Sequence, residues 1–211
     1  MLIVILITLL FIVLRFTVTV FNFVSNPKLT RVSRHYDDLV SILIPARNEQ
    51  ENILQLLQSI LKQDYKNYEV IVYDDESTDD TYNICEEFAA GHTSFSIVKG
   101  YKLPGDWLGK NYACHQLAKK ARGKYLLFLD ADTIVSNGLI NSAVHRMYLN
   151  KLGLLSVFPN QLMQTTGEKI TVPLLHFLLL NTFPLRLAFL TKNPSAATAC
   201  GQLMLFDAEV Y

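Results

Sequence analysis

Several features that mark common protein classes are missing from this sequence of 211 residues. Its only cysteines are Cys85, Cys114 and Cys200, which lie far apart and form no CxxC pair. An odd, scattered set of cysteines argues against a disulfide framework and against a structural zinc site. We therefore expect packed or half-buried thiols in a reducing compartment.

An excess of charge of one sign is missing as well. The 19 basic residues balance 19 acidic ones, so the formal net charge is zero. Nucleic-acid-binding domains normally show a basic excess, and we therefore predict no nucleic-acid partner. Internal repeats and low-complexity tracts are also absent. Hydrophobic residues make up 50% of the chain, which predicts one domain with a sizeable core, plus appendages.

Glycine is missing where a dinucleotide-binding protein needs it. The first predicted strand, Val40 to Ile44, is followed by Pro45-Ala46-Arg47-Asn48-Glu49, whereas a Rossmann unit has a GxGxxG loop at this place. A nicotinamide or flavin enzyme is therefore not expected. A carboxylate and an amide at a strand end can instead hydrogen-bond a base and a ribose. Taken alone, Glu49 is better explained as a helix N-terminal acid stabilised by the helix dipole.

The amino-terminal segment is a long apolar run. Met1 to Val24 is made almost entirely of Leu, Ile, Val, Phe and Thr, with Arg15 as its one charge. A membrane span needs about 20 apolar residues, and the segment lacks the basic start and small-residue end of a cleaved signal peptide. We predict a retained transmembrane anchor, with an interfacial helix as the alternative.

The charges in and after this segment bear on its orientation. Arg15 is either costly in mid-membrane or snorkels toward one face. Basic residues follow the anchor, and such residues favour the cytoplasmic side, so we expect the remaining chain to lie inside the cell. The basic residues are Lys28, Arg31 and Arg34.

Strand and helix patterns alternate after a polar linker over residues 25–38. Apolar runs predict strands at 40–44, 69–73, 95–99, 124–129 and 154–158. Helical spacing predicts helices at 49–62, from the capping residues 77–79 to about 90, at 111–121 and at 137–150. This alternation predicts an α/β fold with a mainly parallel sheet and helices on both faces. Ligands bind beyond the carboxyl ends of the strands in such sheets.

The chain is less regular after residue 158. Residues 170–191 are strongly apolar but interrupted by Pro173 and Pro184, which argues against a clean membrane span. A pair of short interfacial or re-entrant helices and a buried pair of core helices both remain open. A further strand is predicted from Ala196 to Phe206. The chain stops as Asp207-Ala208-Glu209 opens a predicted helix, and we expect a fragment of a longer protein.

Acidic residues gather at two of the predicted strand ends. Asp74-Asp75-Glu76-Ser77-Thr78-Asp79 follows the second strand, where a carboxylate can accept a hydrogen bond from a base, or the stretch is a solvated helix cap. Asp130-Ala131-Asp132 follows the fourth strand. Magnesium-like ions bind one or two carboxylates and take substrate phosphates as further ligands. The pair therefore predicts a metal site for a nucleotide diphosphate, with a turn of capping acids as the alternative.

The loop from Pro104 to Asn111 has an unusual composition. It holds the single tryptophan of the chain, Trp107, together with two glycines and Lys110 at a predicted helix start. A lysine at a helix N-terminus beside a metal site attracts a diphosphate. Trp107 could cover a base or a sugar, and a packed anchor for a surface loop is the competing interpretation.

Three of these segments together resemble family 2 glycosyltransferases of the GT-A fold. They are residues 41–49 (SILIPARNE), 72–79 (VYDDESTD) and 128–132 (FLDAD). Residues 107–114 (WLGKNYAC) resemble a subgroup that acts on lipids and includes diaponeurosporenoate and hopene-type glycosyltransferases. The resemblance extends over residues 40–206, and the apolar segments fit a lipid acceptor.

The resemblance implies inverting, metal-dependent transfer of a sugar from a nucleotide diphosphate sugar, expected to be a UDP-sugar, to a lipid or isoprenoid acceptor at the cytoplasmic membrane face. It implies that Glu49 and Asp75 contact the nucleotide and that Lys110 lies near the diphosphate. Asp130 would lie by the ribose or the metal, and Asp132 would ligate Mg²⁺ or Mn²⁺. The full candidate set for nucleotide-sugar binding is Pro45, Arg47, Glu49, Asp74, Asp75, Trp107, Lys110 and Asp130.

The chain departs from the family pattern at two places. Glu76 stands where the family usually has glycine, and the catalytic base, an acid of a Glu-Asp motif, is expected beyond Tyr211. We therefore predict an anchor at 1–24, a linker at 25–38 and a GT-A domain at 39–211, truncated at its C-terminal end. Two alternatives are a membrane-tethered binding module without catalysis and a phosphatase of the haloacid-dehalogenase type, whose DxD motif has Thr or Val where Ile134 stands.

Overall fold

The structure is a computed structural model that describes residues 1–25, 28–101, 103–105, 107–182, 184–186 and 199–211. The chain forms two compact units. The larger unit contains residues 29–159 and 199–211, and the smaller one contains residues 1–28 and 160–198.

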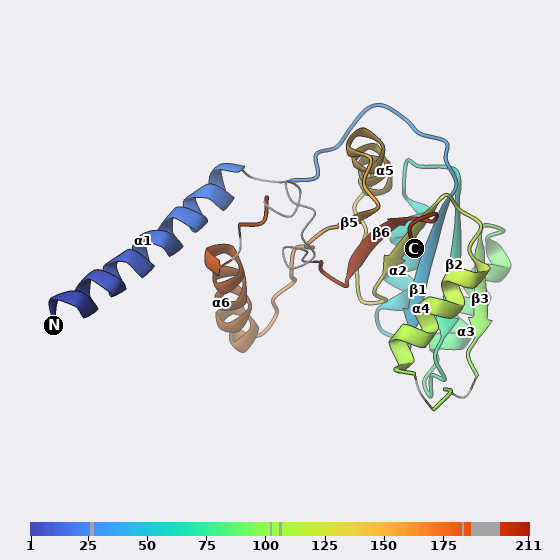
Figure 1. Cartoon of the computed structure of the whole chain (residues 1–211). Coiled ribbons are helices and arrows are strands. Elements are labelled where there is room, and N and C mark those ends of the chain that lie inside the picture. Colours follow the sequence, from blue (N-terminus) through green and yellow to red (C-terminus); the bar gives the residue numbers. More distant parts are fainter. Residues whose placement is uncertain (26–27, 102, 106, 183, 187–198) are drawn as a thin grey trace. The chain divides into compact units, whose positions relative to one another are not determined.

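The larger unit is built on a six-stranded sheet with the strand order β3-β2-β1-β4-β6-β5 (Figure 1). Neighbours among the first four are parallel, whereas β6 runs antiparallel to both β4 and β5. The predicted mainly parallel sheet is thereby confirmed. The strands are β1 (Val40–Ala46), β2 (Tyr68–Asp74), β3 (Phe95–Lys99), β4 (Tyr125–Leu129), β5 (Leu154–Ser156) and β6 (Leu203–Asp207).

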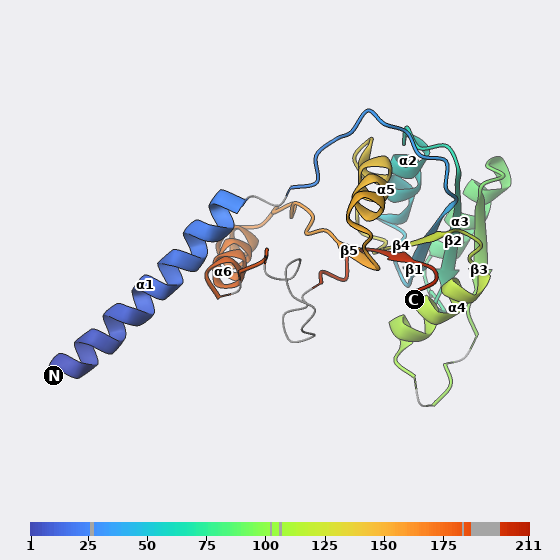
Figure 2. The same cartoon turned by 45° about the horizontal axis from the view of Figure 1, so that its top comes forward.

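Helices cover both faces of this sheet, as predicted (Figures 1 and 2). On one face, apolar side chains of α2, α3 and α5 pack on Ile42 and Ile44 of β1. On the other face, Ala113 and Leu117 of α4 belong to a second cluster with Leu43. Because β1 is covered on both sides, it is an almost continuous apolar run. The helices are α2 (Ile53–Leu61), α3 (Thr81–Gly91), α4 (Gly109–Lys120) and α5 (Leu139–Asn150).

The strand register brings the carboxyl ends of β2, β1 and β4 to one edge of the sheet. Ala46 at the end of β1 lies opposite Asp74 at the end of β2. Leu43 lies opposite Phe128 near the end of β4. The loops that follow these strands therefore meet at the same edge, and they contain most of the predicted site residues.

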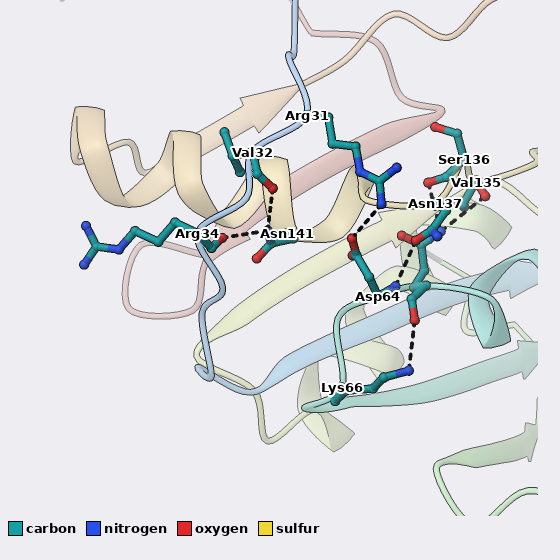
Figure 3. A network of polar contacts seen from close by, with 10 residues as sticks. Arg31, Val32, Arg34, Asp64, Lys66, Val135, Ser136, Asn137 and Asn141 are labelled. Carbon is teal, nitrogen blue, oxygen red and sulfur yellow. Dashed lines mark hydrogen bonds and ion pairs between the residues drawn. The ribbon is translucent and has the colours of Figure 1, made fainter.

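Residues 29–38, which we call the strap, are bound to the larger unit. Figure 3 shows Arg31 paired with Asp64, with 3.3 Å between Nη2 and Oδ2. The Asn141 side chain donates hydrogen bonds to the carbonyls of Val32, at 3.3 Å, and Arg34, at 2.7 Å. Most of the predicted linker is thus attached to the domain rather than extended between two parts.

The strap stays attached up to the start of β1. Leu29 and Tyr36 pack against the core, and Tyr36 Oη lies 2.6 Å from His145 Nδ1 on α5. Asp38 forms an ion pair of 3.0 Å with Lys124. The compact unit accordingly begins at residue 29. The domain bounds drawn from the sequence remain a prediction.

Among its described residues, the smaller unit contains the helices α1 (Leu2–Ser25) and α6 (Thr166–Thr182), which contact each other. α1 is long and apolar enough to cross a membrane, which confirms the apolar N-terminal helix. The sequence predicts a break at Pro173, but α6 runs through it. One proline removes a single hydrogen bond of the helix ladder, and the residues that follow it, Leu174 and Leu175, are good helix formers. Residues 187–191 of the predicted helix pair lie outside the described residues.

One local prediction near the end of the chain is wrong. Residues 199–202 are not part of a strand, because β6 begins at Leu203 after a turn; residues 196–198 lie outside the described residues. Asp207 ends β6, and its backbone carbonyl accepts hydrogen bonds from the N–H groups of Val210, at 3.0 Å, and Tyr211, at 3.2 Å. The Asp207 carboxylate accepts a hydrogen bond from the Glu209 N–H at 3.0 Å, which is the bond of a helix N-cap. These residues form a single turn, and the helix start at Asp207 stays a prediction.

Candidate functional site

The loops that follow β1 and β2 are hydrogen-bonded to each other. Asn48 Oδ1 accepts from the Thr78 N–H at 2.8 Å, and the Asn48 N–H donates to Ser77 Oγ at 3.0 Å. The Glu49 N–H donates to the hydroxyl of Thr81 at 2.8 Å. Sequence patterns indicate local helix caps at 77–79. Asp79 Oδ1 accepts a hydrogen bond from the Thr81 N–H at 3.1 Å at the start of α3, whereas Ser77 bonds across to the other loop. The acidic turn is therefore fixed against the end of β1.

Two residues in these loops have a left-handed backbone conformation. Asn48 and Glu76 both have φ of 55°. Asparagine visits this region more readily than most residues, because its short side chain bonds locally, whereas a residue such as glutamate pays roughly 1–2 kcal/mol there. The conformation of Glu76 explains why a glycine is favoured at this place, and it shows that the turn forms with glutamate.

The paired acids after β2 have different surroundings. Asp74 is 2% exposed; its Oδ2 accepts from the Ser77 N–H at 3.4 Å, and its Oδ1 has no hydrogen-bond partner in the described part of the chain. Asp75 Oδ2 lies 3.7 Å from Arg47 Nη1. A Cβ atom at Gly109 would lie 2.9 Å from the same oxygen. Asp74 thus supports the turn, and Asp75 lies between the β1 loop and the start of α4.

Asp130 and Lys110 form a close ion pair at the end of β4. The distance between Lys110 Nζ and Asp130 Oδ1 is 2.6 Å. The Asp130 N–H donates to the carbonyl of Gln202, and the Asp130 carbonyl accepts from the Thr133 hydroxyl at 2.7 Å. Asp132 is exposed within this turn. We call the edge of the sheet where Asp74, Asp75, Asp130 and Asp132 lie at or just after the strand ends the acidic edge. The first turn of α4 brings Lys110 to this edge, as the sequence predicts.

The oxygen donors of this turn suit a hard divalent cation. Asp130 and Asp132 supply two carboxylates, and the Lys110 ammonium already holds a positive charge against one of them. The described residues contain no group of three or more His, Cys, Asp or Glu that could hold a metal. Ions such as Mg²⁺ need only one or two carboxylates when phosphates and water supply the other ligands. The residues therefore fit an ion that binds together with a nucleotide diphosphate.

Trp107 packs on the side of α4. Its ring stacks on that of His115, with 5.0 Å between centroids and 23° between planes, and it meets Tyr112 edge-on at 5.6 Å. This arrangement favours the packed-anchor interpretation, and a contact with a base or sugar stays a prediction. The sequence analysis did not single out His115. Its spacing of three residues from Tyr112, which places both on one helix face, was the available signal.

Pro45 and Glu49 lie on the β1 side of the site. Pro45 is half-buried within β1, in register with Tyr73 of β2. The Glu49 carboxylate accepts a hydrogen bond of 2.9 Å from the Asn52 side chain, just before α2. This position matches the helix-start interpretation of Glu49, and its contact with a nucleotide stays a prediction.

The thiols of Cys85 and Cys114 are difficult to ionise in this fold. Burial raises the pKa of the Cys114 thiol, although the neighbouring Lys110 ammonium acts in the opposite direction. Burial also raises the pKa of Cys85 to about 12. Thiols of this kind stay protonated and are weak nucleophiles. All three cysteines are free, one buried and two half-buried, which confirms the expected packing.

A hollow of about 450 Å³ lies at the opposite edge of the sheet, among the first residues of the strands. Its wall includes Arg122 and Glu69, whose side chains are joined by an ion pair of 2.6 Å. Burial opposes ionisation of Glu69, but hydrogen bonds from Ser41 and Arg122 outweigh it and lower the pKa of the carboxyl. The charges of Glu69 and Arg122 neutralise each other and link the starts of neighbouring strands. The hollow lies at the opposite end of the strands from the acidic edge and is a separate feature.

Comparisons with known proteins agree with the sequence patterns. The family model described as "Glycosyl transferase family 2" matches residues 41–211. The 4,4'-diaponeurosporenoate glycosyltransferase of Staphylococcus haemolyticus is 32% identical over 139 residues, which cover 63% of this chain and 35% of that protein. The Staphylococcus aureus protein of the same name is 36% identical over 122 residues, or 57% of this chain and 31% of that protein. The matched part spans about a third of these relatives.

The fold matches a solved structure over nearly the whole chain. The mannosyltransferase PcManGT from Pyrobaculum calidifontis, solved in complex with GDP-Man and Mn²⁺, has a TM-score of 0.64 and 20% sequence identity. The match covers 94% of this chain and 55% of that one. This likeness confirms the predicted fold.

Proposed function

The chain belongs to glycosyl transferase family 2, and we propose that the protein transfers a sugar from a nucleotide diphosphate sugar to a lipid or isoprenoid acceptor at a membrane surface. The observation that carries this proposal is the meeting of charged groups beyond neighbouring strands. Asp75 with Arg47 and Asp130 with Lys110 lie at the carboxyl edge of β2, β1 and β4, where α/β sheets bind their ligands.

The donor side of the proposed site lies around Asp75. Its carboxylate pairs with Arg47 at 3.7 Å, and this pairing would orient it to accept a hydrogen bond from a base N–H. We propose uracil as the base, with Glu49 and Pro45 on the same side of the pocket. Trp107 would line the sugar end, where an aromatic ring can pack against a pyranose.

The diphosphate side lies around Asp130 and Asp132. We propose that these carboxylates hold Mg²⁺ or Mn²⁺, which when bound neutralises the diphosphate and stabilises it as a leaving group. Lys110 stands at the N-terminus of α4, where the helix dipole also favours an anion. The Lys110 ammonium would then leave Asp130 and pair with an oxygen of the diphosphate. The PcManGT complex contains Mn²⁺, which supports this choice of ion.

The proposed reaction inverts the anomeric centre. An oxygen of the acceptor attacks the anomeric carbon from the face opposite the diphosphate, and the bond between that carbon and the phosphate oxygen breaks. A hydroxyl acceptor must lose its proton to a carboxylate base. A carboxylate acceptor is already ionised near neutral pH and needs that base less. The relatives named 4,4'-diaponeurosporenoate glycosyltransferase support an isoprenoid acceptor.

We further propose that α1 anchors the protein in the cell membrane with the larger unit on the cytoplasmic side. The helix is long and apolar enough to span, and Lys28, Arg31 and Arg34 follow it closely. Basic residues next to a span are retained on the cytoplasmic side. This placement brings the site to the side where nucleotide sugars occur and keeps it near a lipid acceptor.

Replacing Asp132 with alanine tests the site. The Asp132→Ala variant of the full-length protein should lose Mn²⁺-dependent sugar transfer by at least about 100-fold, because a lost metal ligand removes several kcal/mol of transition-state stabilisation. Calorimetry should show the same loss in Mn²⁺-dependent binding of UDP-sugar. Glu51→Ala, which removes an exposed acid before α2, is the matched control. Full activity in the Asp132 variant would reject the assignment.

A further inference from the structure

α1 carries one charged side chain and one amide side chain within its apolar length, Arg15 and Asn22. They precede the helix end at Ser25 by ten and three residues, or about 15 and 5 Å along the axis at 1.5 Å per residue. The Arg15 guanidinium lies 5.1 Å from the centroid of the Phe11 ring. A charge or an amide at such depth in a bilayer is costly unless a partner satisfies it.

Both side chains find their partners at the C-terminal end of α6. Arg15 Nη1 donates to the hydroxyl of Thr182 at 2.8 Å. Asn22 Nδ2 donates to the carbonyl of Leu180 at 2.6 Å, and Asn22 Oδ1 accepts from the Leu185 N–H at 2.9 Å. The Asn22 side chain thus hydrogen-bonds both a carbonyl in the last turn of α6 and a backbone N–H just beyond that helix.

These contacts are of a kind that a water-free surrounding requires. The Leu180 carbonyl belongs to the last turn of α6, whose carbonyls lack partners within the helix. Water satisfies such groups in a soluble protein, whereas hydrocarbon leaves them to protein partners. Asn22 is 5% and Asn181 6% exposed, although most of the apolar side chains around them are exposed. Polar side chains buried between otherwise exposed apolar helices are typical of helix contacts inside membranes.

The surface of α6 changes character along its length. Its first turn is polar, and the Glu168 carboxylate accepts hydrogen bonds from the N–H groups of Gln164 and Thr165. From residue 170 to residue 180 the side chains are apolar around the helix, apart from Thr171 and His176. A helix that lies flat on a membrane keeps one continuous polar face, and this stretch has none. The exposed apolar residues are Ile170, Leu174, Leu175, Phe177, Leu178 and Leu180.

We propose that α6 is a re-entrant helix, which enters the bilayer beside the C-terminal half of α1 and is held there by Arg15–Thr182 and the contacts of Asn22. The inference rests on the proposed role of α1 as the anchor. The chain passes from α1 into the larger unit and from that unit into α6. The end of α1 and the start of α6 therefore face the same side of the membrane, and the end of α6 reaches the depth of the Arg15–Asn22 segment.

Depth-dependent fluorescence quenching tests this placement. Trp107 is the only tryptophan, so the Trp107→Phe background allows single probes at Ile170→Trp, Leu178→Trp and Leu9→Trp. Leu54→Trp on α2 is the control in the larger unit, where Leu54 is 41% exposed. Each protein is reconstituted in phosphatidylcholine vesicles that carry bromine either near the headgroup or deep in the acyl chain.

The expected result is a gradient along α6. The tryptophan at 170 should be quenched best by bromine near the headgroup, and the tryptophan at 178 by bromine deep in the acyl chain. The control tryptophan at 54 should be quenched by neither. Equal depths at 170 and 178 would overturn the re-entrant arrangement in favour of a flat helix. Quenching at 9 without quenching at 178 would overturn membrane entry of α6 while leaving the anchor intact. No nucleotide sugar is present, so the outcome is independent of the proposed transfer reaction.

The polar contact itself is tested at Thr182. Thr182→Val keeps the shape of the side chain but removes the hydroxyl, whereas Thr182→Ser keeps the hydroxyl and is the matched control. In the valine variant the probe at 178 should move to the shallow quencher, and in the serine variant it should keep its depth. Circular dichroism of each variant verifies the helix content. An unchanged depth in a folded valine variant would reject the role of Arg15–Thr182.

Discussion

At the scale of single residues, Lys110 occupies a carboxylate that the proposed metal ion would also bind. The Lys110 ammonium lies 2.6 Å from Asp130 Oδ1, and the Lys110 side chain is 56% exposed, so the pair contributes at most about 1 kcal/mol. Lys110→Gln should therefore bind Mn²⁺ alone up to about fivefold more tightly. The same variant should bind Mn²⁺ with UDP-sugar more weakly, because it loses the diphosphate contact.

Electron paramagnetic resonance titration of free Mn²⁺, with and without UDP-sugar, measures both effects. Lys119→Gln changes an exposed lysine in the last turn of the same helix and should alter neither. Lys110→Gln could instead bind Mn²⁺ alone with unchanged or lower affinity. That result would show that the Lys110–Asp130 ion pair does not weaken metal binding.

Glu76 shows how a single residue can carry a conformational cost at the site. Its φ of 55° costs a non-glycine residue roughly 1–2 kcal/mol. A glycine avoids this cost, but it loses more conformational entropy on folding, which offsets part of the gain. Glu76→Gly should stabilise the protein by about 0.5–1 kcal/mol, measured as a higher urea midpoint. Glu76→Ala keeps the cost and should give no gain. Equal midpoints for the glycine and alanine variants would contradict this explanation.

At the scale of elements, α4 approaches the acidic edge closely because its first residue has no side chain. A Cβ atom at Gly109 would meet Asp75 Oδ2 at 2.9 Å, so Gly109→Ala must displace Asp75 or the first turn of α4. We expect binding of UDP-sugar to weaken by about tenfold, or about 1.4 kcal/mol. Gly105→Ala is the matched control, because no atom lies within 4 Å of its added Cβ.

Calorimetry on both glycine variants measures this effect, with the unfolding temperature as a check on stability. Unchanged affinity at Gly109→Ala would mean that the distance between α4 and Asp75 does not shape the site. The strap should not contribute to the difference between the two variants. Its contacts in Figure 3 are with Asp64 and Asn141, and neither glycine takes part in them.

At the scale of the whole molecule, the proposed membrane anchor and the proposed donor site belong to different units. The predicted site residues lie in the larger unit, and α1 lies in the smaller one. Removing residues 1–28 should therefore leave the affinity for UDP-sugar in detergent within about twofold. The same variant should be released from vesicles by an alkaline wash, because a spanning helix anchors far more firmly than a helix that only enters the surface.

Sedimentation with vesicles and calorimetry in detergent measure these two properties. The full chain, treated in the same way, is the control. A shortened chain that stays with the vesicles after the wash would show that α1 is dispensable for attachment. A large loss of donor affinity would show instead that the two units cooperate in binding.

Local patterns in the sequence predict the elements of the larger unit well. The strand at 95–99 agrees with β3 at both ends, and β1, β2 and β4 were each predicted within a few residues. Buried strands are continuous apolar runs and surface helices repeat their apolar residues every three to four positions, so the information lies within a few neighbouring residues. The last strand was predicted less well, because its pairing with β4 begins only at Leu203, and an apolar run does not mark where pairing with a neighbouring strand begins.

The sequence by itself determined where the strands end to within about two residues, which acids could hold a cation and which family the chain resembles. Only the tertiary structure decided which of these residues meet. The partners Lys110 and Asp130 are 20 residues apart, and Arg15 and Thr182 are 167 apart. Such pairs depend on strand order and on the packing of helices that are distant in the sequence. The same packing gave the buried neighbours Asp74 and Asp75 different partners, because Asp74 bonds within its own turn and Asp75 pairs with Arg47.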